Sequence, residues 1–420
     1  MLSAFTNSLK IPELRQRIFF TVALIFVCRL IAVIPLPGVD AATLQAVVDR
    51  MVSQSGDIGF MGLLDLFSGG ALTQAAIGAL GIMPSITASI ILQLLTAVMP
   101  SLGQLAREGD AGRQKIIQYG RYLTVALCIV QGYTMAAVLL NPGRLGLQVM
   151  AGEQIVVINK VAFMLIALLC MTTGTMLLMW LGEQITARGI GNGISLIITI
   201  SIVSRLPGAI QQAYDMFRRG QANVFLSVTM LVLAFLVIGV TIAVTQAQRK
   251  IPVQYAKRVV GRKMYGGQST HLPMKVNMSG VMPIIFAQPI IQIVAAAVKY
   301  FAAPTGRLHD FAMMLSETTW LHIAIYSVLI VFFTFFWVAT QFNAIEISEN
   351  LKKDGSFVPG VRPGRATAEY LDDVMTKITL IGALGLLVLA ILPLVIQSKM
   401  GVPHTIAGFF GGTSLLIIVG

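Results

Sequence analysis

Ten apolar runs of about the length of a membrane span alternate with shorter polar segments along this chain. A helix needs about 20 apolar residues to cross the hydrocarbon core of a bilayer. Of the 420 residues, 56% are hydrophobic and only 11% are charged, a composition far from that of soluble domains. We therefore expect an all-α polytopic membrane protein with ten transmembrane helices. They should lie at about residues 18–36, 75–99, 122–141, 158–181, 190–206, 223–246, 276–298, 322–343, 376–396 and 405–420.

The first five runs and the last five are spaced alike. Because five is odd, the second half begins on the opposite side of the membrane from the first, which is the arrangement of inverted repeats. No repeat of individual residues accompanies this spacing, so the inference rests on counting alone. It predicts an N-terminal half over residues 1–206 and a C-terminal half over residues 207–420, with a pathway between them near the midplane.

Lysine and arginine are distributed unevenly between the two sets of loops. With the N-terminus in the cytoplasm, 20 of the 30 fall in cytoplasmic loops and nine on the far side, while Arg29 lies inside the first run. The positive-inside rule favours this orientation, and ten spans return the C-terminus to the cytoplasm. The sequence after the first run does not resemble a cleavage site, so we expect a retained span. An interfacial helix over residues 1–14 could precede it.

A half-length apolar segment, residues 60–67, precedes the second run, and Ser68-Gly69-Gly70 separates the two. Adjacent glycines weaken a helix and permit a sharp turn. A helix too short to cross the bilayer must be surrounded by protein. A re-entrant segment followed by a span is compatible with a channel and with many transporters. Beyond the turn, one helix face carries a stripe of branched residues: Ile82, Ile86 and Ile90.

The loop over residues 246–275 contains seven cations and no acid. Alternating residues around Ile251–Tyr255, followed by glycines, predict a short hairpin. One explanation of the charge is the positive-inside rule, by which cytoplasmic loops are rich in lysine and arginine. An anionic partner is the other, either phosphate-rich RNA or an acidic protein surface.

A second large polar loop, residues 343–377, contains two Pro-Gly dipeptides. Pro359-Gly360 and Pro363-Gly364 bracket Arg362, and this pattern predicts a tight, projecting turn. A solvated loop with one stray arginine is the alternative.

The glycines of residues 188–195, RGIGNGIS, are more consistent with close helix approach than with phosphate binding. No strand precedes them, and no Lys-Ser/Thr pair follows. Small residues are the usual means by which membrane helices approach each other.

Some polar residues lie within the apolar runs. Thr87, Gln131 and Gln288 each need a partner in hydrocarbon, and contacts between helices are the usual explanation. Arg29 is a functional candidate because it is a charged residue at the depth of the membrane. Snorkelling of its side chain or capping of backbone carbonyls would explain its presence equally well.

No enzyme motif is present. The chain has no HExxH, GxSxG or Walker sequence, and its four histidines are dispersed. The three cysteines lie in apolar runs without metal-ligand spacing. We expect no catalytic activity, metal or cofactor.

Several of these stretches resemble the SecY family, the central subunit of the protein-conducting channel. The resemblance runs from about residue 9 to the end of the sequence. The matching motifs are FSGGAL (67–72), ALGIMP (79–84), ASIILQLL (88–95), GIGNGIS (189–195), QRKIPVQYAKR (248–258), QSTHLPMKVN (268–277), NLKKDGSFVPGVRPG (350–364) and GGTSLLII (411–418).

The resemblance implies two inverted five-helix halves around a central hourglass pore, closed at rest by a half-helix plug at about residues 58–70. Its implied plug residues are Phe60, Leu63, Leu64, Asp65, Phe67, Gly69 and Gly70. Its implied constriction is a ring of Ile82, Ile86, Ile190, Ile194, Ile285 and Ile417. An aliphatic ring excludes water and ions by dewetting, and it contacts any passing chain without recognising its sequence.

The resemblance also implies a lateral gate, through which hydrophobic segments reach the lipid, and two cytoplasmic docking loops, residues 246–275 and 343–377. Its implied gate residues are Thr87, Gln131 and Gln288. Its implied docking residues are Arg249, Lys250, Lys257, Arg258, Lys352, Lys353 and Arg362.

The implied function is that of a passive channel in the bacterial cytoplasmic membrane for unfolded secretory proteins and inserting membrane segments. The energy would come from a SecA-type ATPase or a translating ribosome, whose ribosomal RNA would contact the basic loops. SecE and SecG are the implied small subunits, with SecE clamping the halves.

Two rival classes lack the features that they require. A secondary transporter needs a polar site at the midplane, where this sequence offers isoleucines. A membrane-embedded enzyme needs a convergent acid, base or metal cluster, and none is visible. The tenth run has sixteen residues, from 405 to 420, whereas the family continues into a cytoplasmic tail. The alternatives of a cut chain and a tail beyond this numbering both stay open.

Overall fold

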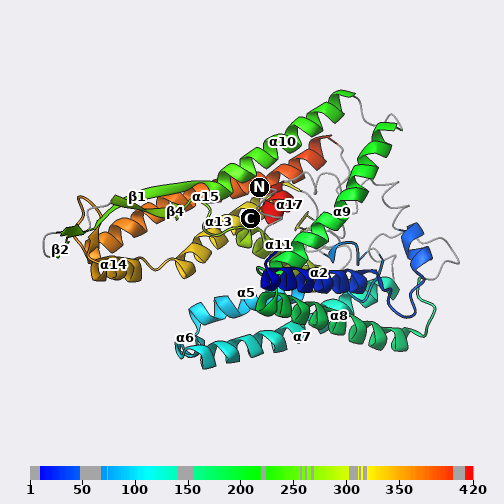
Figure 1. Ribbon diagram of the computed structural model, residues 1–420. Coiled ribbons are helices and arrows are strands. Elements are labelled where there is room, and N and C mark those ends of the chain that lie inside the picture. Colours follow the sequence, from blue (N-terminus) through cyan, green and yellow to red (C-terminus); the bar gives the residue numbers. More distant parts are fainter. Residues whose placement is uncertain are drawn as a thin grey trace. The chain divides into compact units, whose positions relative to one another are not determined.

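The computed structural model describes most of the chain as two compact units, Met1–Asn223 with Lys399–Phe409, and Val224–Ser398 with Phe410–Gly420 (Figure 1). We describe each unit by itself. The residues described are 10–47, 68–72, 74–140, 155–218, 224–255, 258–260, 263–265, 269–301, 311, 314–315, 319–400 and 412–419.

The first unit is a bundle of long helices. Within it, α8 packs against α2, α7 and α9, and α5 packs against α7. The helices are α2 (Pro12–Val33), α5 (Met83–Val98), α6 (Pro100–Arg107), α7 (Asp110–Leu140), α8 (Lys160–Arg188) and α9 (Gly193–Arg218).

The second unit combines helices with short strands. In this unit α11 packs against α13, and α10 packs against α17. The helices are α10 (Val224–Gln246), α11 (Met282–Phe301), α13 (Trp320–Gln341), α14 (Ala344–Lys353), α15 (Arg365–Met400) and α17 (Gly412–Val419). The strands are β1 (Gln248–Tyr255), β2 (Arg258–Val260), β3 (Lys263–Tyr265), β4 (Ser269–Lys275) and β5 (Ser356–Phe357).

Each of the ten apolar runs contains a helix in the part of the chain that the structure describes. Among those residues, six helices are long and apolar enough to cross a membrane, and a seventh span is obtained if α5 and α6, bent by 104°, count as one. The all-α polytopic membrane fold is thereby confirmed. The expected interfacial helix over residues 1–14 lies largely outside the described residues.

The second run was expected to be helical from residue 75, and this expectation is wrong, because α5 begins only at Met83. The residues before it form an irregular segment whose backbone pairs with the end of α2. Leu36 donates to the Ala75 carbonyl at 2.9 Å, and Ile77 donates to the Ile34 carbonyl at 2.9 Å. Ala75 is fully buried. Irregular backbone at membrane depth is tolerated where protein surrounds it, and this segment meets that condition.

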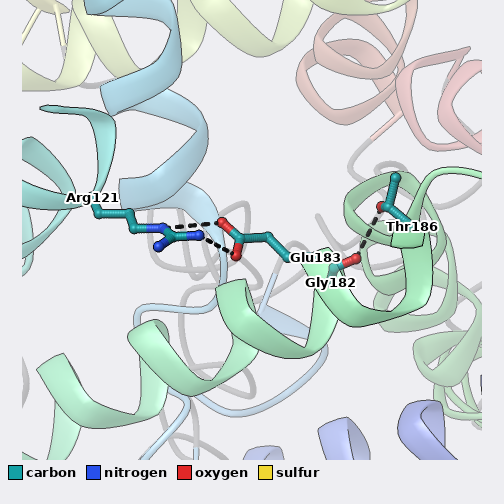
Figure 2. Close-up of polar contacts among 4 residues, drawn as sticks. All are labelled: Arg121, Gly182, Glu183 and Thr186. Carbon is teal, nitrogen blue, oxygen red and sulfur yellow. Dashed lines mark hydrogen bonds and ion pairs between the residues drawn. The ribbon is translucent and has the colours of Figure 1, made fainter. Parts of the chain in front are cut away.

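An ion pair joins α7 to α8 (Figure 2). Arg121 Nη2 lies 2.7 Å from Glu183 Oε2, and Arg121 Nε donates to Glu183 Oε1 at 3.4 Å. The side chains are 49% and 32% exposed, so solvent weakens the pair to roughly 1 kcal/mol or less. One turn along α8, Thr186 Oγ1 donates to the Gly182 carbonyl at 3.0 Å (Figure 2).

Candidate functional site

The Ser68-Gly69-Gly70 turn has the sharp backbone that its glycines predict. Gly69 and Gly70 have φ values of +67° and +96°, in the left-handed region that glycine adopts without a steric penalty. Arg29 of α2 donates from Nη2 to the Gly69 carbonyl at 3.0 Å. Of the alternatives for Arg29, the structure therefore supports capping of a backbone carbonyl. The plug residues Phe60, Leu63, Leu64, Asp65 and Phe67 lie outside the described residues.

Two residues of the expected isoleucine ring lie at the start of α5. Ile82 occupies the N-cap position, and Ile86 follows one turn later. They are 3% and 9% exposed. Ile82 lines a small cavity of the first unit together with Arg29, Ser68 and Ile200. The start of α5 is thus adjacent to the glycine turn in space as well as in sequence.

Two further ring residues lie in and just after the loop between α8 and α9. Ile190 is 39% exposed, and its backbone N–H donates to Thr21 Oγ1 of α2 at 3.2 Å. Asn192 Oδ1 accepts from the Ile194 N–H at 3.1 Å, which caps the start of α9. This short loop is therefore fixed by side chains on both sides.

The glycines of this loop permit close helix approach, as the sequence predicts. A Cβ on Gly193 would overlap the Gly182 carbonyl of α8, and one on Gly189 would lie 2.5 Å from Thr21 Oγ1. The Gly193 N–H donates to Thr186 Oγ1 at 2.9 Å. Such contacts leave the two glycines no room for side chains.

The remaining ring residues belong to the second unit. Ile285 on α11 is 5% exposed, and Ile417 on α17 is 8% exposed. Both are buried as core isoleucines are. Convergence of the six isoleucines stays a prediction.

The three expected lateral-gate residues lie on α5, α7 and α11. Thr87 is 5% exposed, and its hydroxyl donates to the Met83 carbonyl of its own helix at 3.0 Å. The carbonyl four residues earlier thus satisfies the donor of this hydroxyl within α5, and a contact of Thr87 with another helix stays a prediction. Gln131 is half-buried on α7. Their grouping with Gln288 stays a prediction.

The two basic loops of the second unit form one structure, which the sequence did not reveal. Strand β1 pairs antiparallel with β4, aligning Ile251 with Leu272. The same strand pairs on its other edge with β5, which aligns Gln254 with Phe357. The sheet order is β4-β1-β5, and Figure 1 shows β1 and β4 side by side. The predicted hairpin around Ile251–Tyr255 is confirmed, and β5 joins the second loop to it.

A shared hydrophobic core lies beneath this sheet. Ile251 and Met274 from the hairpin pack in one buried cluster with Val358 from the second loop and Leu371 from α15. Leu371 is fully buried. Burial of a side chain of this size contributes roughly 1.5–3 kcal/mol, so the cluster holds the two loops together.

Arg362 lies on a turn whose backbone carbonyls are hydrogen-bonded to neighbouring hydroxyl groups. Gly360 and Gly364 have φ values of +84° and +103°. The Gly364 carbonyl accepts from Ser348 Oγ of α14 at 2.6 Å, and the Arg362 carbonyl accepts from Thr367 Oγ1 at 2.8 Å. The Arg362 side chain is exposed. The predicted tight turn is confirmed, and its arginine faces solvent.

The other expected docking residues are distributed over the same region. Arg249 and Lys250 are exposed on β1, and Arg258 belongs to β2, which pairs with β3. Lys257 lies outside the described residues. Lys352 and Lys353 are exposed in the last turn of α14, where positive charge complements the helix dipole.

Sequence reasoning missed Arg205 as a site residue. Its guanidinium lies against Gly70, whose added Cβ would be 3.3 Å from Nε. The signal was available, because Arg205 sits near the end of an apolar run, where a charge is a functional candidate. Within the described ranges, no three His, Cys, Asp or Glu side chains are grouped to hold a metal ion.

The fold is that of solved protein-conducting channels. A structure described as "The structure of a protein conducting channel" matches with a TM-score of 0.64 and 18% identity, covering 96% of this chain and 89% of that one. "Sec61 in the Canine ribosome-channel complex from the endoplasmic reticulum" matches with a TM-score of 0.58 and 16% identity, covering 96% and 89%. The SecY family model matches residues 76–420, and the chain belongs to the SecY family.

Curated relatives match over nearly their whole length. The "Protein translocase subunit SecY" of Streptomyces coelicolor is 46% identical over 423 residues, covering 100% of this chain and 95% of the relative. That of Escherichia coli K12 is 46% identical over 410 residues, covering 97% and 89%. The resemblance identified from motifs is therefore confirmed.

Proposed function

We propose that this chain is the channel subunit of a bacterial protein translocase, a passive pore for unfolded secretory proteins that also releases hydrophobic segments into the lipid. The SecY family match over residues 76–420 carries this proposal. Structural neighbours described as protein-conducting channels support it through their fold.

The channel would be closed by two seals. Ile82, Ile86, Ile190, Ile194, Ile285 and Ile417 would form the constriction, and residues 60–67 would form the plug. The spacing of Ile82 and Ile86, one turn apart at the start of α5, supports the first assignment together with the family match. An aliphatic ring excludes ions and makes no sequence-specific bonds to a passing chain. The halves on either side of the pore would be residues 1–206 and 207–420.

The lateral gate would contain Thr87, Gln131 and Gln288. The packing of α5 against α7 supports the pairing of the first two helices. A gate of this kind needs polar groups that can exchange hydrogen-bond partners. Thr87 has such a partner within its own helix, the Met83 carbonyl.

The cytoplasmic docking surface would be the sheet β4-β1-β5 with its adjoining turn and helix. Arg249, Lys250, Lys352, Lys353 and Arg362 are exposed there, and Arg258 belongs to the neighbouring strand β2. Lys257, which precedes Arg258 in the sequence, is proposed as part of the same surface. A dense positive surface attracts ribosomal RNA and acidic protein surfaces. A ribosome and a SecA-type ATPase are therefore the proposed sources of energy. SecE and SecG are the proposed small subunits.

The proposed location is the bacterial cytoplasmic membrane, with both termini in the cytoplasm. The excess of lysine and arginine in alternate loops supports this orientation. The chain itself would bind no nucleotide and catalyse no reaction.

A stalled secretory chain tests the proposal directly. Single cysteines at Ile82, Ile190 and Ile285 should form crosslinks to a stalled substrate in membrane vesicles, whereas a cysteine at the exposed position Phe19 of α2 should not. Crosslinks at Phe19 but at none of the isoleucines would rule out the proposed pathway. Saturable uptake of a small solute without polypeptide transport would favour a transporter.

A further inference from the structure

A small cavity of the first unit lies between α2, α8, α9 and the irregular segment before α5. The space in it that is open to the centre of a water-sized molecule is about 20 Å³, and one water needs roughly 10–15 Å³ of such space. Much of its wall is apolar and includes Ile82, Leu178 and Ile197. The cavity therefore has room for one water or one ion of similar size.

Arg29 of α2 brings a positive charge to the wall of this cavity. A guanidinium has five N–H donors and no acceptor. Arg29 Nη2 donates to the Gly69 carbonyl at 3.0 Å, which uses one of the five. Among the described residues, no carboxylate forms an ion pair with Arg29. Its charge is therefore left without a counter-ion in this part of the chain.

Ser201 of α9 lines the same cavity and is 8% exposed. Its carbonyl accepts from Ser204 Oγ at 2.8 Å, whereas its own hydroxyl forms no hydrogen bond within the described part of the chain. Burial of a hydroxyl without a partner is costly. An occupant of the cavity that accepts a hydrogen bond would remove this cost.

The guanidinium of Arg29 and the side chain of Ser201 approach each other beside Gly69. A Cβ added to Gly69 would overlap Arg29 Nη1 and would lie 3.0 Å from Ser201 Cβ. Arg205 of α9 adds a second positive charge at the next residue of the turn, because its Nε would lie 3.3 Å from a Cβ added to Gly70. Two like charges repel each other, and each is costly at the depth of the membrane.

This combination of groups favours an anion over other small occupants. A metal cation requires acceptor oxygens, and the guanidinium would repel it. A water molecule would satisfy the serine hydroxyl but would leave the charge of Arg29 without compensation. Phosphate and sulfate are too large for a space of about 20 Å³, whereas a halide is only slightly larger than water. The occupant that fits both the size and the charge is a single halide ion.

We propose that this cavity binds one chloride ion, which accepts hydrogen bonds from the Arg29 guanidinium and the Ser201 hydroxyl. The ion compensates the charge of Arg29 at membrane depth and connects α2 to α9. The proposal does not depend on the proposed transport function, because it uses only groups that lie together in the first unit.

Thermal unfolding of the detergent-solubilised protein tests the proposal, with chloride replaced stepwise by gluconate at constant ionic strength. The midpoint should rise with chloride and then saturate, because a ligand that binds only the folded protein stabilises it by mass action. Bromide should act as chloride does, and gluconate is too large for the cavity. Equal midpoints in chloride and gluconate at every concentration would overturn the proposal.

Two variants locate the effect of chloride in the cavity. Arg29→Gln keeps an N–H donor for the Gly69 carbonyl but removes the charge, so the dependence on chloride should be lost. Ser201→Ala should shift the dependence severalfold to higher chloride. Arg121→Gln is the matched control, because Arg121 is paired with Glu183 (Figure 2), and it should leave the dependence unchanged. An equal dependence in the wild-type protein and in Arg29→Gln would place the ion elsewhere and contradict the proposal.

Bromide also provides a measurement that needs no variant. Diffraction from crystals of the wild-type protein in bromide should show an anomalous peak in the cavity, next to Arg29 and Ser201. A cavity without a peak, at a bromide concentration that saturates the change in unfolding midpoint, would overturn the proposal and identify the occupant as water.

Discussion

Thr21 Oγ1 of α2 accepts a hydrogen bond from the Ile190 N–H at 3.2 Å and donates to the Arg17 carbonyl of its own helix at 2.8 Å. One hydroxyl thereby fixes the backbone of a predicted ring residue to a helix that is distant in sequence. Gly189 lies directly against the same oxygen. The position of Ile190 thus depends on α2 as well as on the helices that flank it.

Thr21→Val should destabilise the protein by roughly 1–3 kcal/mol, because the part-buried Ile190 N–H loses its acceptor while the size of the side chain is preserved. Thermal unfolding of the detergent-solubilised protein measures this effect. Thr173→Val is the matched control: Thr173 is exposed on α8 and bonds only to the Leu169 carbonyl at 2.7 Å among the contacts described. Equal losses in the two variants would contradict the role of Thr21.

Gly193→Ala should destabilise the first unit by about 1–3 kcal/mol or more, since its Cβ would overlap the Gly182 carbonyl and force α8 and α9 apart. The comparison is Gly208→Ala on the same helix, where no atom lies within 4 Å of the added Cβ. There alanine should be neutral or stabilising by up to about 1 kcal/mol, through its helix propensity. Unfolding midpoints that fall equally would argue against close packing at Gly193.

Arg362→Glu should lower motor-driven translocation at least tenfold and leave membrane insertion and thermal stability unchanged. The exposed side chain extends from a backbone held by Ser348 and Thr367, so charge reversal alters the surface and not the fold. Arg365→Glu makes the same charge change three residues away, on an exposed side chain that pairs with Glu369 of α15 at 3.1 Å. Its translocation should change less than twofold, and similar losses in both would indicate a general charge effect.

Asp40 should make the stability of the first unit depend on pH. The Thr43 hydroxyl, and then the Thr43 and Ala42 N–H groups, hold the pKa of the Asp40 carboxyl below its ordinary value. A carboxyl whose pKa is depressed by folding contributes stability above its unfolded pKa of about 3.9, and this contribution is lost as the pH falls through the lower folded pKa.

The cost of Asp40→Ala should therefore be largest near pH 7 and should shrink below about pH 4, where protonation also weakens the hydrogen bonds that Thr43 and Ala42 donate to the carboxylate. Unfolding midpoints across this range provide the measurement. Asp40→Asn keeps the Oδ1 acceptor for the Ala42 N–H without a titrating group, so its midpoint should vary less with pH. A constant difference between Asp40 and Asp40→Ala would exclude this contribution.

The polytopic fold could be read from the sequence because the hydrocarbon core requires long, apolar, internally hydrogen-bonded segments. Every run contains a helix. The start of the second span could not be read, because the sequence before Met83 is as apolar as the helix itself. The backbone groups of the segment before Met83 bond instead to Ile34 and Leu36, which follow α2. Such a tertiary contact cannot be predicted from the composition of the segment.

The local geometry of the candidate site was partly predictable. Glycines in the sequence indicated the turns at Gly69 and around Arg362, because few residues other than glycine adopt a positive φ. The contacts of Arg29, Arg205 and Thr21 were not predictable, because each joins segments far apart in sequence. Thr87 shows the reverse case, where a hydroxyl expected to bridge helices bonds within its own.

The three-stranded sheet links the ends of several helices in the second unit mechanically. Strand β1 begins two residues after α10 ends at Gln246, β4 leads into α11, and the turn after β5 leads into α15. Strand β1 pairs with β4 along most of its length and with β5 at its last two residues, Gln254 and Tyr255, so the sheet connects all three segments. A force applied by a partner at Arg362 would therefore be transmitted through the sheet to all three helices together. Separate loops would transmit it to one helix at a time.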